Sequence, residues 1–479
     1  MTGRLLALLR RVSLRQLLRD PRAELGRILG GVGRRLESTG KRISHARREM
    51  PAWLNGEINA LAHFEPELLG PEGCGVHYRH YGVPVDTRAG VLYRELAAAV
   101  GACRATHVLI VPWLVRGGAD RGALYHLKAW VESMPAANVL VILTEDINSP
   151  WLDRIPAGIR VLHFGRMLGP MGMPGRVQLL TRLLVQMQPK VIHVINSRVA
   201  WESFRLHGLA LRQASRLFAS LFCDDRNNDG VPVGYARSYL RECRTHLAGV
   251  FCDNDVFPDL WVQELGVPRQ LFTVLRFPYD RMVVRKDDDF GIDGAPRILW
   301  AGRFDRQKRP DVLLAIARTM PSVPFDVYGV SELGRVHPAI SELQRLPNVK
   351  LHGSFSRFED IAGKAHAAYL FTSSWEGVPT ILLDASAAGL PIVAPAVGGI
   401  VDLIDRAILV DASDDVAAYV EQLQQLIDSP ALRRNRREQQ YAALAVGRGW
   451  ADFAGALRQI PYYLPGASAT LTHKKGRSS

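Results

Sequence analysis

The sequence predicts an α/β protein built from two doubly wound domains, and three observations support this prediction. From Thr106 to Val274, apolar segments of strand length alternate with segments of helical period, which indicates a parallel sheet covered by helices on both faces. A polar linker that includes Lys286–Gly291 follows, and a second series of the same kind begins at Arg297. The length of 479 residues suits two such domains with extensions better than it suits one.

The first series is predicted to form parallel strands separated by helices. Its strands are His107–Trp113, Val139–Thr144, Arg160–Phe164, Val191–Asn196, Leu217–Cys223, Val250–Asp253 and Leu271–Val274. Its helices include Ala119–Ser133, Arg176–Gln186, Ser197–Ala214, Tyr235–His246 and Pro258–Glu264. Two doubly wound sheets in one chain imply a cleft between them, in which ligands bind at the C-terminal ends of the strands.

The net charge of +13 is concentrated at the two ends of the chain. The first 50 residues contain thirteen Lys or Arg against four Asp or Glu, and the charges of the tail after His473 are all basic. Residues 1–48 therefore have two readings, an interfacial arm that binds anionic lipid or a solvated basic extension. Nucleic-acid binding is disfavoured, because no aromatic residue occurs before Trp53 to provide a stacking platform.

The five cysteines are scattered, odd in number and without CxxC spacing, so the sequence predicts neither a disulfide framework nor a zinc site. No uninterrupted apolar stretch approaches the ~18–20 residues that cross a bilayer. We therefore expect a cytoplasmic protein, with the basic arm as its candidate contact with the inner face of the cytoplasmic membrane.

The segment Ser373–Asp384 places two carboxylates, Glu376 and Asp384, eight positions apart. The first lies in a Gly/Pro turn after the apolar run Ala368–Phe371, and the second lies in the opening turns of a predicted helix. Pro379 suits the first turn of that helix, where its missing N–H costs nothing. Free N–H groups and the positive end of the helix dipole then point toward the space beside Glu376. This combination suits a phosphorylated sugar, and the alternative is a helix-terminal acid beside a surface acid.

Two further segments flank this motif. Upstream, Ile298–Asp311 reads as a strand, a glycine turn, two cations (Arg303 and Lys308) five positions apart, and the start of a helix. Downstream, Leu390–Ala394 reads as a short buried strand and is followed by the glycine pair of Val397–Ile400. In this order and at these separations, the segments resemble the C-terminal domain of the retaining GT-B glycosyltransferases of family GT4 (glycosyl transferases group 1).

The resemblance covers about residues 297–446 and implies a GT-B fold, with two Rossmann-like domains facing across a cleft. It implies transfer of a sugar from a nucleotide-diphosphate donor to a glycan or lipid-linked acceptor, with retained anomeric configuration, in cell-surface polysaccharide or glycolipid synthesis. The expected organisation is a basic extension (1–50), an irregular lead-in (51–104), an acceptor-side domain (105–285), a nucleotide-sugar-binding domain (292–446), a C-terminal helix that crosses back to the first domain (447–465) and a basic tail (466–479).

The resemblance also assigns roles to residues of the second domain. Arg303 and Lys308 are expected to hold the diphosphate, for which a forked guanidinium and a mobile ammonium are suited. Glu376 is expected to bind hydroxyls of the donor sugar, and Asp384 to reach the ribose, although the family normally has Glu at that position. Other expected donor contacts are Gly377, Thr380, Ile381, Gly398 and Gly399. The alternatives are salt-bridged surface cations and, for the glycine pair, a plain left-handed turn.

The first domain offers three candidate sites. Gly117 and Gly118 follow the first strand and open a helix, so they form either an anion cradle or a tight βα turn. Asp224 and Asp225 stand at a strand end where many relatives place a His facing the donor sugar, and they could polarise an acceptor hydroxyl or simply be solvated caps. His193, near the end of the preceding strand, is either a cleft residue or a buried strand histidine.

We expect no metal and no cofactor. The segment Cys252–Asp255 mimics the Asp-x-Asp metal motif of GT-A transferases, but Arg303 and Lys308 supply the positive charge that such a metal provides. Two rival functions remain: a catalytically silent GT-B protein that binds a nucleotide sugar or glycan, and a GT-B sugar-nucleotide epimerase. A dehydrogenase is disfavoured, because the glycines after the first strand lack the spacing of a dinucleotide fingerprint.

Overall fold

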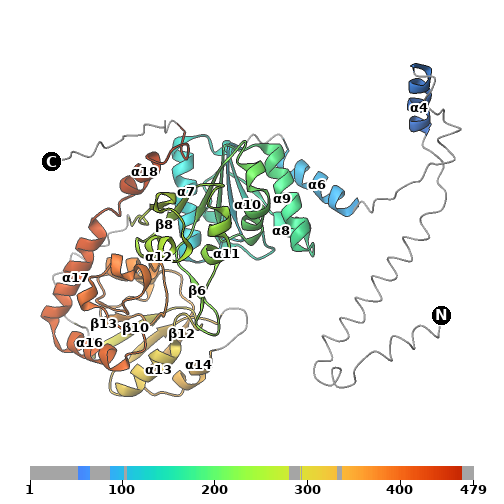
Figure 1. Ribbon diagram of the computed structural model, residues 1–479. Coiled ribbons are helices and arrows are strands. Elements are labelled where there is room, and N and C mark those ends of the chain that lie inside the picture. Colours follow the sequence, from blue (N-terminus) through green and yellow to red (C-terminus); the bar gives the residue numbers. More distant parts are fainter. Residues whose placement is uncertain are drawn as a thin grey trace, which may run out of the picture. The chain divides into compact units, whose positions relative to one another are not determined.

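The computed structural model contains two α/β domains (Figure 1). The described residues are 52–64, 87–101, 105–279, 292, 294–331 and 337–465. The basic arm, the basic tail and the linker Lys286–Gly291 lie outside them, so the predictions for these segments stay predictions. Helix α4 (Ala52–Phe64) belongs to a compact unit separate from the one that begins at Ala89, and each unit is described by itself.

The first domain contains a seven-stranded parallel sheet with the strand order β3-β2-β1-β4-β5-β8-β9. Its strands are β1 (His107–Val111), β2 (Val139–Leu143), β3 (Arg160–Leu162), β4 (Val191–Ile195), β5 (Arg216–Ser220), β8 (Leu247–Cys252) and β9 (Phe272–Val274). All seven predicted strands of this domain are confirmed. The strand order reverses between β1 and β4, and a crevice for ligands is typical of such a reversal point.

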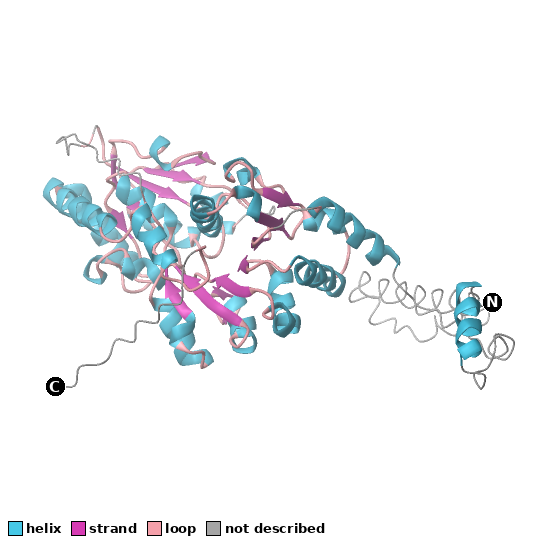
Figure 2. Cartoon of the chain, turned by 90° about the horizontal axis from the view of Figure 1, so that it is seen from above, coloured by secondary structure: helices cyan, strands magenta, loops and turns pink. Residues whose placement is uncertain are grey.

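Helices cover both faces of this sheet, as Figure 2 shows. They are α6 (Thr87–Val100), α7 (Gly118–Ser133), α8 (Phe164–Leu168), α9 (Met173–Met187), α10 (Arg198–Leu211), α11 (Tyr235–Cys243) and α12 (Val256–Leu265). Successive side chains of a strand alternate between the two faces. In β1, Leu109 and Val111 join the cluster that includes Trp130 of α7, whereas Val108 and Ile110 join the cluster on the opposite face. This double burial explains why the strands are apolar throughout.

The second domain contains a five-stranded parallel sheet with the order β12-β11-β10-β13-β14. Its strands are β10 (Arg297–Ala301), β11 (Phe325–Tyr328), β12 (Val349–Gly353), β13 (His366–Leu370) and β14 (Ile392–Val393). Its helices are α13 (Pro310–Thr319), α14 (Pro338–Leu343), α15 (Thr380–Ala387), α16 (Val416–Asp428) and α17 (Pro430–Ala445), and the C-terminal helix α18 (Trp450–Arg458) follows them. The remaining elements are an antiparallel pair, β6 (Asp225–Arg226) and β7 (Pro232–Val233), and 3₁₀ turns at Ala136–Asn138, Pro150–Arg154, Arg269–Leu271, Phe358–Asp360, Gly398–Asp402 and Arg406–Ile408.

The segment before the first domain differs from its prediction. Residues 51–104 were expected to be irregular, but they contain the helices α4 and α6. In α6, Leu92, Leu96 and Val100 recur every four residues and form one apolar stripe. Leu96 and Val100 are buried in the hydrophobic core of the first domain, so tertiary packing stabilises this helix. The prediction was wrong because the nearby Gly and Pro residues are typical of irregular structure.

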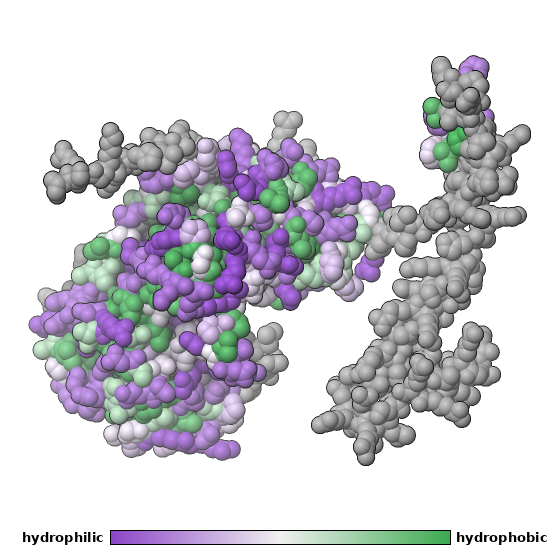
Figure 3. Space-filling view, viewed as in Figure 1, coloured by the Kyte–Doolittle hydropathy of each residue, from purple (hydrophilic) through white to green (hydrophobic). Residues whose placement is uncertain are grey.

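The C-terminal helix α18 packs on the first domain, as predicted (Figure 1). The indole of Trp450 donates a hydrogen bond to Glu132 of α7 at 2.8 Å, and Phe453 packs against Tyr125 of the same helix. None of the described helices combines the length and apolar composition that a bilayer-spanning helix needs. On the face shown in Figure 3, hydrophilic and hydrophobic residues are interspersed over the described surface.

Candidate functional site

The two predicted motifs of the second domain meet where its strand order reverses. β10 and β13 are neighbours, so the loops that follow their carboxyl ends start side by side. The first loop carries Lys308 and the second carries Glu376. The Lys308 ammonium donates a hydrogen bond to Oε1 of Glu376, and the two side chains are only 15% and 10% exposed. The structure therefore pairs these two predicted catalytic residues at the position that doubly wound sheets use for ligands.

Hydrogen bonds between the two loops hold this pair in place. The side-chain amide of Gln307 donates to the carbonyl of Trp375 at 2.8 Å, and its backbone carbonyl accepts from Ser374 N at 2.9 Å. Oγ1 of Thr372 donates to the carbonyl of Lys308 at 2.6 Å. Because Lys308 is anchored through its backbone as well as its ammonium, it is not an ordinary solvated surface lysine.

Arg303 is placed differently from Lys308. Its side chain is 44% exposed, and it interacts with its own loop through Gln307 at 2.8 Å and Asp305 at 3.1 Å. Arg303 therefore stands at the rim of the loop pair, whereas Lys308 is buried within it. Sequence analysis assigned both cations to the diphosphate, and only the structure distinguishes their positions.

The predicted glycines are required by close approaches between loops. Gly398 has a φ of +51°, and a Cβ there would lie 1.8 Å from the carbonyl oxygen of Glu376. A Cβ on Gly399 would lie 2.7 Å from Asn254 of the first domain, and one on Gly377 would lie 3.0 Å from the carboxylate of Asp253. These glycines fix the backbone around Glu376. Their contact with a donor stays a prediction.

The glycine loop of the first domain adjoins helix α15 of the second. A Cβ on Gly118 would lie 3.4 Å from Cγ2 of Thr380, the first residue of α15. Pro379 is the N-cap of this helix, one position earlier than expected, and Asp384 lies in its second turn. The next predicted donor residue, Ile381, is partly buried against the core. The two loops that the sequence assigned to the donor phosphates therefore lie next to each other.

Asp384 has a partner that the sequence did not reveal. The guanidinium of Arg121, in the first turn of α7, donates two hydrogen bonds to its carboxylate, at 3.2 and 3.1 Å. The preceding loop also reaches the second domain, because Arg116 donates to the carbonyl of Phe355 and lies 4.2 Å from the centre of its ring. A search for cations one turn beyond Gly117 would have identified Arg121 as a cleft residue.

The turn at Gly117 is stabilised within the first domain. A Cβ on Gly117 would lie 2.8 Å from Oδ2 of Asp120, so the backbone and this carboxylate approach closely. Burial raises the pKa of Asp120 to about 6. Gly117 therefore has a local structural reason to be glycine, in addition to the predicted anion cradle.

His193 is a core residue rather than a cleft residue. It is 0% exposed, and its ring nitrogens bond to the hydroxyls of Tyr463 and Ser220, each at 2.8 Å. The Tyr463 hydroxyl also bonds to Nδ1 of His126 at 2.8 Å. His193 is the third residue of β4, so its side chain points onto the α7 face and anchors the C-terminal segment there.

The two acids after β5 lie in different environments. Asp224 is buried, accepts a hydrogen bond from Nε of Arg237 at 2.8 Å and forms an ion pair with the same guanidinium at 2.6 Å. It also accepts from the indole of Trp261 at 2.9 Å. Its carboxylate therefore joins helices α11 and α12 to the sheet and has no access to an acceptor. Asp225 is exposed in the β6–β7 pair, where it accepts from the backbone N–H of Arg226, and its acceptor role stays a prediction.

The two acids of the Asp-x-Asp segment have separate partners. Asp253 is buried and accepts from the backbone N–H of Val378 at 2.9 Å and from Asn254 at 2.6 Å. Burial raises its pKa to about 7. Asp255 instead forms an ion pair with Arg276 at 2.9 Å. Within the described ranges, no group of three His, Cys, Asp or Glu side chains could hold a metal ion. Metal independence itself stays a prediction.

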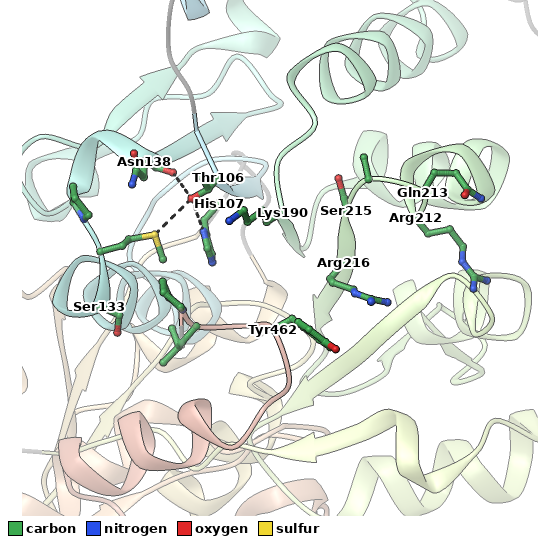
Figure 4. A pocket seen from close by; sticks show the side chains of 15 residues that line it. Thr106, His107, Ser133, Asn138, Lys190, Arg212, Gln213, Ser215, Arg216 and Tyr462 are labelled. Atoms are coloured by element: carbon green, nitrogen blue, oxygen red, sulfur yellow. Dashed lines mark hydrogen bonds between the residues drawn. The ribbon is translucent and has the colours of Figure 1, made fainter. Parts of the chain in front are cut away.

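A cavity of about 680 Å³ lies at the amino ends of the strands of the first sheet (Figure 4). Its lining includes Thr106, Lys190 and Ser215, which directly precede β1, β4 and β5, together with Tyr462 from the C-terminal segment. Ligands of doubly wound sheets bind at the carboxyl ends of the strands, and this cavity adjoins their amino ends. It is therefore separate from the site around Glu376.

Comparison with known proteins agrees with this geometry. Residues 285–443 match the family described as Glycosyl transferases group 1. The O-antigen biosynthesis glycosyltransferase WbnH of Escherichia coli is 27% identical over 126 residues, which cover 26% of this chain and 36% of that protein. D-inositol 3-phosphate glycosyltransferase 1 of Catenulispora acidiphila is 27% identical over 183 residues, which cover 34% of this chain and 43% of that protein. The chain thus spans less than half the length of these curated relatives.

Solved structures resemble a larger part of the chain. The lipopolysaccharide outer core galactosyltransferase WaaB gives a TM-score of 0.51 at 16% identity and covers 73% of this chain and 98% of its own. TarM gives 0.56 at 11% identity, with coverages of 73% and 97%. Anabaena HepE, in complex with UDP-glucose, gives 0.54 at 16% identity, also with 73% and 97%. Residues 285–443 thus match the family of glycosyl transferases group 1, and the chain shares the GT-B fold of these solved structures.

Proposed function

We propose that this chain transfers a sugar from a nucleotide-diphosphate donor to a glycan or lipid-linked acceptor, with retention and without a metal ion. The observation that supports this most is the Lys308–Glu376 pair at the reversal point of the second sheet. It combines a fixed cation, suited to a diphosphate, with a carboxylate, suited to sugar hydroxyls. The adjoining Gly118 loop and the start of α15 supply backbone N–H groups on the other side.

The proposed roles follow from how charge develops during transfer. Cleavage of the bond between sugar and diphosphate leaves negative charge on the leaving group, which Lys308 stabilises, with Arg303 assisting from the rim. An ammonium has three N–H donors, so Lys308 can keep its bond to Glu376 while it binds phosphate. Glu376 positions the sugar through its hydroxyls. In the expected front-face reaction, the leaving phosphate accepts the proton of the acceptor hydroxyl.

We assign Asp384 to the ribose of the donor. Its carboxylate is already held by Arg121, so donor binding shares or replaces that interaction. His193 and Asp224 have no role in this proposal, because both are buried and bonded within the first domain.

The relatives suggest where to look for substrates. WbnH is named for O-antigen biosynthesis, and the HepE structure contains UDP-glucose. We therefore propose UDP-sugars as the first donors to test and a polysaccharide or glycolipid precursor as acceptor. We further propose that the protein acts at the inner face of the cytoplasmic membrane, with residues 1–48 as its contact with anionic lipid.

The direct test measures release of nucleoside diphosphate from a panel of nucleotide sugars, in excess EDTA, with lipid-linked and soluble acceptors. The matched pair of variants is Glu376→Gln, at the proposed site, and Glu421→Gln, on the exposed face of α16. We expect turnover in the wild type and in Glu421→Gln but not in Glu376→Gln. Binding of a donor without turnover would favour the silent binding protein. Turnover that disappears with EDTA and returns with Mn²⁺ or Mg²⁺ would contradict metal independence.

A further inference from the structure

We propose that Asp253, at the end of β8 in the first domain, is a positioning residue for Glu376 in the second. The inference rests on the proposed function, because that function makes Glu376 important. The contact between Asp253 and the Glu376 loop does not depend on the function. Asp253 touches no expected substrate atom and acts through the backbone of the Glu376 loop.

The contact joins the two domains through one hydrogen bond. Oδ2 of Asp253 accepts from the backbone N–H of Val378 at 2.9 Å, two residues beyond Glu376. Oδ1 of the same carboxylate accepts from Nδ2 of Asn254 at 2.6 Å. Asn254 is itself fixed, because it donates to the carbonyl of Phe222 at 2.9 Å and accepts from Phe257 N at 3.0 Å. The carboxylate is therefore held rigidly and presents one oxygen to the loop.

The shape of the loop matches this carboxylate. A Cβ on Gly377 would lie 3.0 Å from both oxygens of Asp253, so the absence of a side chain lets the two approach. On the other side, a Cβ on Gly399 would meet Cβ of Asn254 at 2.7 Å and the Gly377 carbonyl at 2.9 Å. The Glu376–Val378 backbone is thus enclosed between the end of β8 and the Gly398–Gly399 turn.

The energetics of burial favour a specific role for this acid. A buried carboxylate is costly unless it is hydrogen-bonded and near a positive charge. The cation beside Asp253 is Arg448, which is also buried. Its two terminal nitrogens have no hydrogen-bond partner among the described residues. The hydrogen bonds of the Asp253 carboxylate therefore come from Val378 and Asn254 rather than from Arg448. The Val378 bond therefore ties the loop of Glu376 to the first domain.

The test compares Asp253→Ala, Asp253→Asn and the control Asp259→Asn, a change in an exposed acid on the adjacent helix α12. Asparagine keeps an oxygen that can accept from Val378, whereas alanine keeps none. We expect the Val378 amide to exchange hydrogen for deuterium about tenfold faster or more in Asp253→Ala, as for a lost bond to a charged acceptor. Exchange in Asp259→Asn should stay within about threefold of wild type. Exchange in Asp253→Asn should be slower than in Asp253→Ala, because asparagine keeps the acceptor for Val378 but not the one for Asn254.

Kinetics separate positioning from general destabilisation. We expect Asp253→Ala to lower kcat for transfer at least about tenfold, while its affinity for the nucleoside diphosphate changes little. Wild-type exchange at Val378 in Asp253→Ala would overturn the inference, as would faster exchange with an unchanged kcat. If no variant or wild type transfers sugar, the proposed function fails, and the exchange measurement still decides whether Asp253 holds the loop.

Discussion

The candidate residues of the second domain and those of the first had different outcomes. In the second domain, Lys308 and Glu376 lie in loops beyond the ends of β10 and β13, and they meet. In the first domain, His193 lies within β4 and Asp224 lies just beyond β5, and both face the interior. The direction of His193 is fixed by the pleat of β4, whereas Asp224, in the loop after β5, is held in the interior by its bonds to Arg237 and Trp261.

The first domain still contributes to the site, through residues that carry no family motif. Arg121 reaches Asp384 from the first turn of α7, and Asp253 reaches Val378 from the end of β8. Both contacts cross between domains. On the proposed function, the second domain binds the donor and the first domain positions the residues that bind it.

The largest effect is expected at Glu376. Replacing it with alanine removes the carboxylate that positions the sugar, and a misplacement of about 1 Å can cost on the order of 10²-fold in rate. We expect transfer by Glu376→Ala to fall at least that far, measured as kcat/KM with the preferred donor. The same substitution at His193 should reduce stability instead. If Glu376→Ala and His193→Ala both fold and lose kcat/KM equally, the two domains do not differ in the way proposed.

The next effect separates the two cations. Lys308→Ala should weaken binding of a nucleoside diphosphate by about 1.5–3 kcal/mol, the range for a charge-assisted bond in a closed site. Arg303→Ala should cost less, because Arg303 is 44% exposed and surface cations contribute only about 0–1 kcal/mol. Calorimetric titration measures both, with Lys350→Ala on the exposed edge of β12 as control. A larger loss for Arg303→Ala would reverse the assignment of the buried cation.

A smaller effect tests the Arg121–Asp384 contact. If the ribose and Arg121 share the carboxylate, their contributions to donor binding are coupled. We expect Arg121→Ala, Asp384→Ala and the double variant to show a coupling of about 1 kcal/mol in the binding free energy of a nucleoside diphosphate. Effects that add to within about 0.3 kcal/mol would show that the ribose does not use Asp384 in the presence of Arg121.

The smallest effect is on stability against pH. Burial lowers the pKa of His126 to about 3 and of His107 to about 4, and it holds the pKa of His193 well below its ordinary value. These folded pKa values lie below the unfolded value of about 6.5, so protons bind preferentially to the unfolded chain and stability falls as pH drops below that value. Each histidine should cost about 0.4 kcal/mol at pH 6.5 and more at lower pH.

The second domain should respond later to acid. Burial alone would raise the pKa of Asp326, but hydrogen bonds from Arg297, His366 and His352 lower it overall. A carboxylate with a lowered pKa keeps its stabilising contribution until the pH falls below about 4. When the pH is lowered to 5, the amides of β4 should therefore lose protection against hydrogen exchange, while those of β10 and β11 keep theirs. Simultaneous acceleration in both sheets would argue against the buried histidines as the cause.

The sequence predicted the fold more completely than it predicted the site. Doubly buried strands are apolar throughout, so their positions could be read directly, and all seven predicted strands of the first sheet exist. Helix α6 was missed, because its single apolar stripe is stabilised by packing rather than by a local signal. The partners of Asp384 and Val378 come from residues more than one hundred positions away, and sequence spacing contains no information about such pairs.

The most direct test of the account is the footprint of a nucleoside diphosphate on the wild-type protein, measured by hydrogen–deuterium exchange. UDP would be tested first, followed by ADP, GDP, CDP and dTDP. The account predicts protection in residues 302–309 and 373–384, which contain Lys308 and Glu376, and a smaller effect at Gly117–Arg121. Protection confined to β4, or to the strand starts around Lys190 and Ser215 that line the cavity of Figure 4, would contradict it.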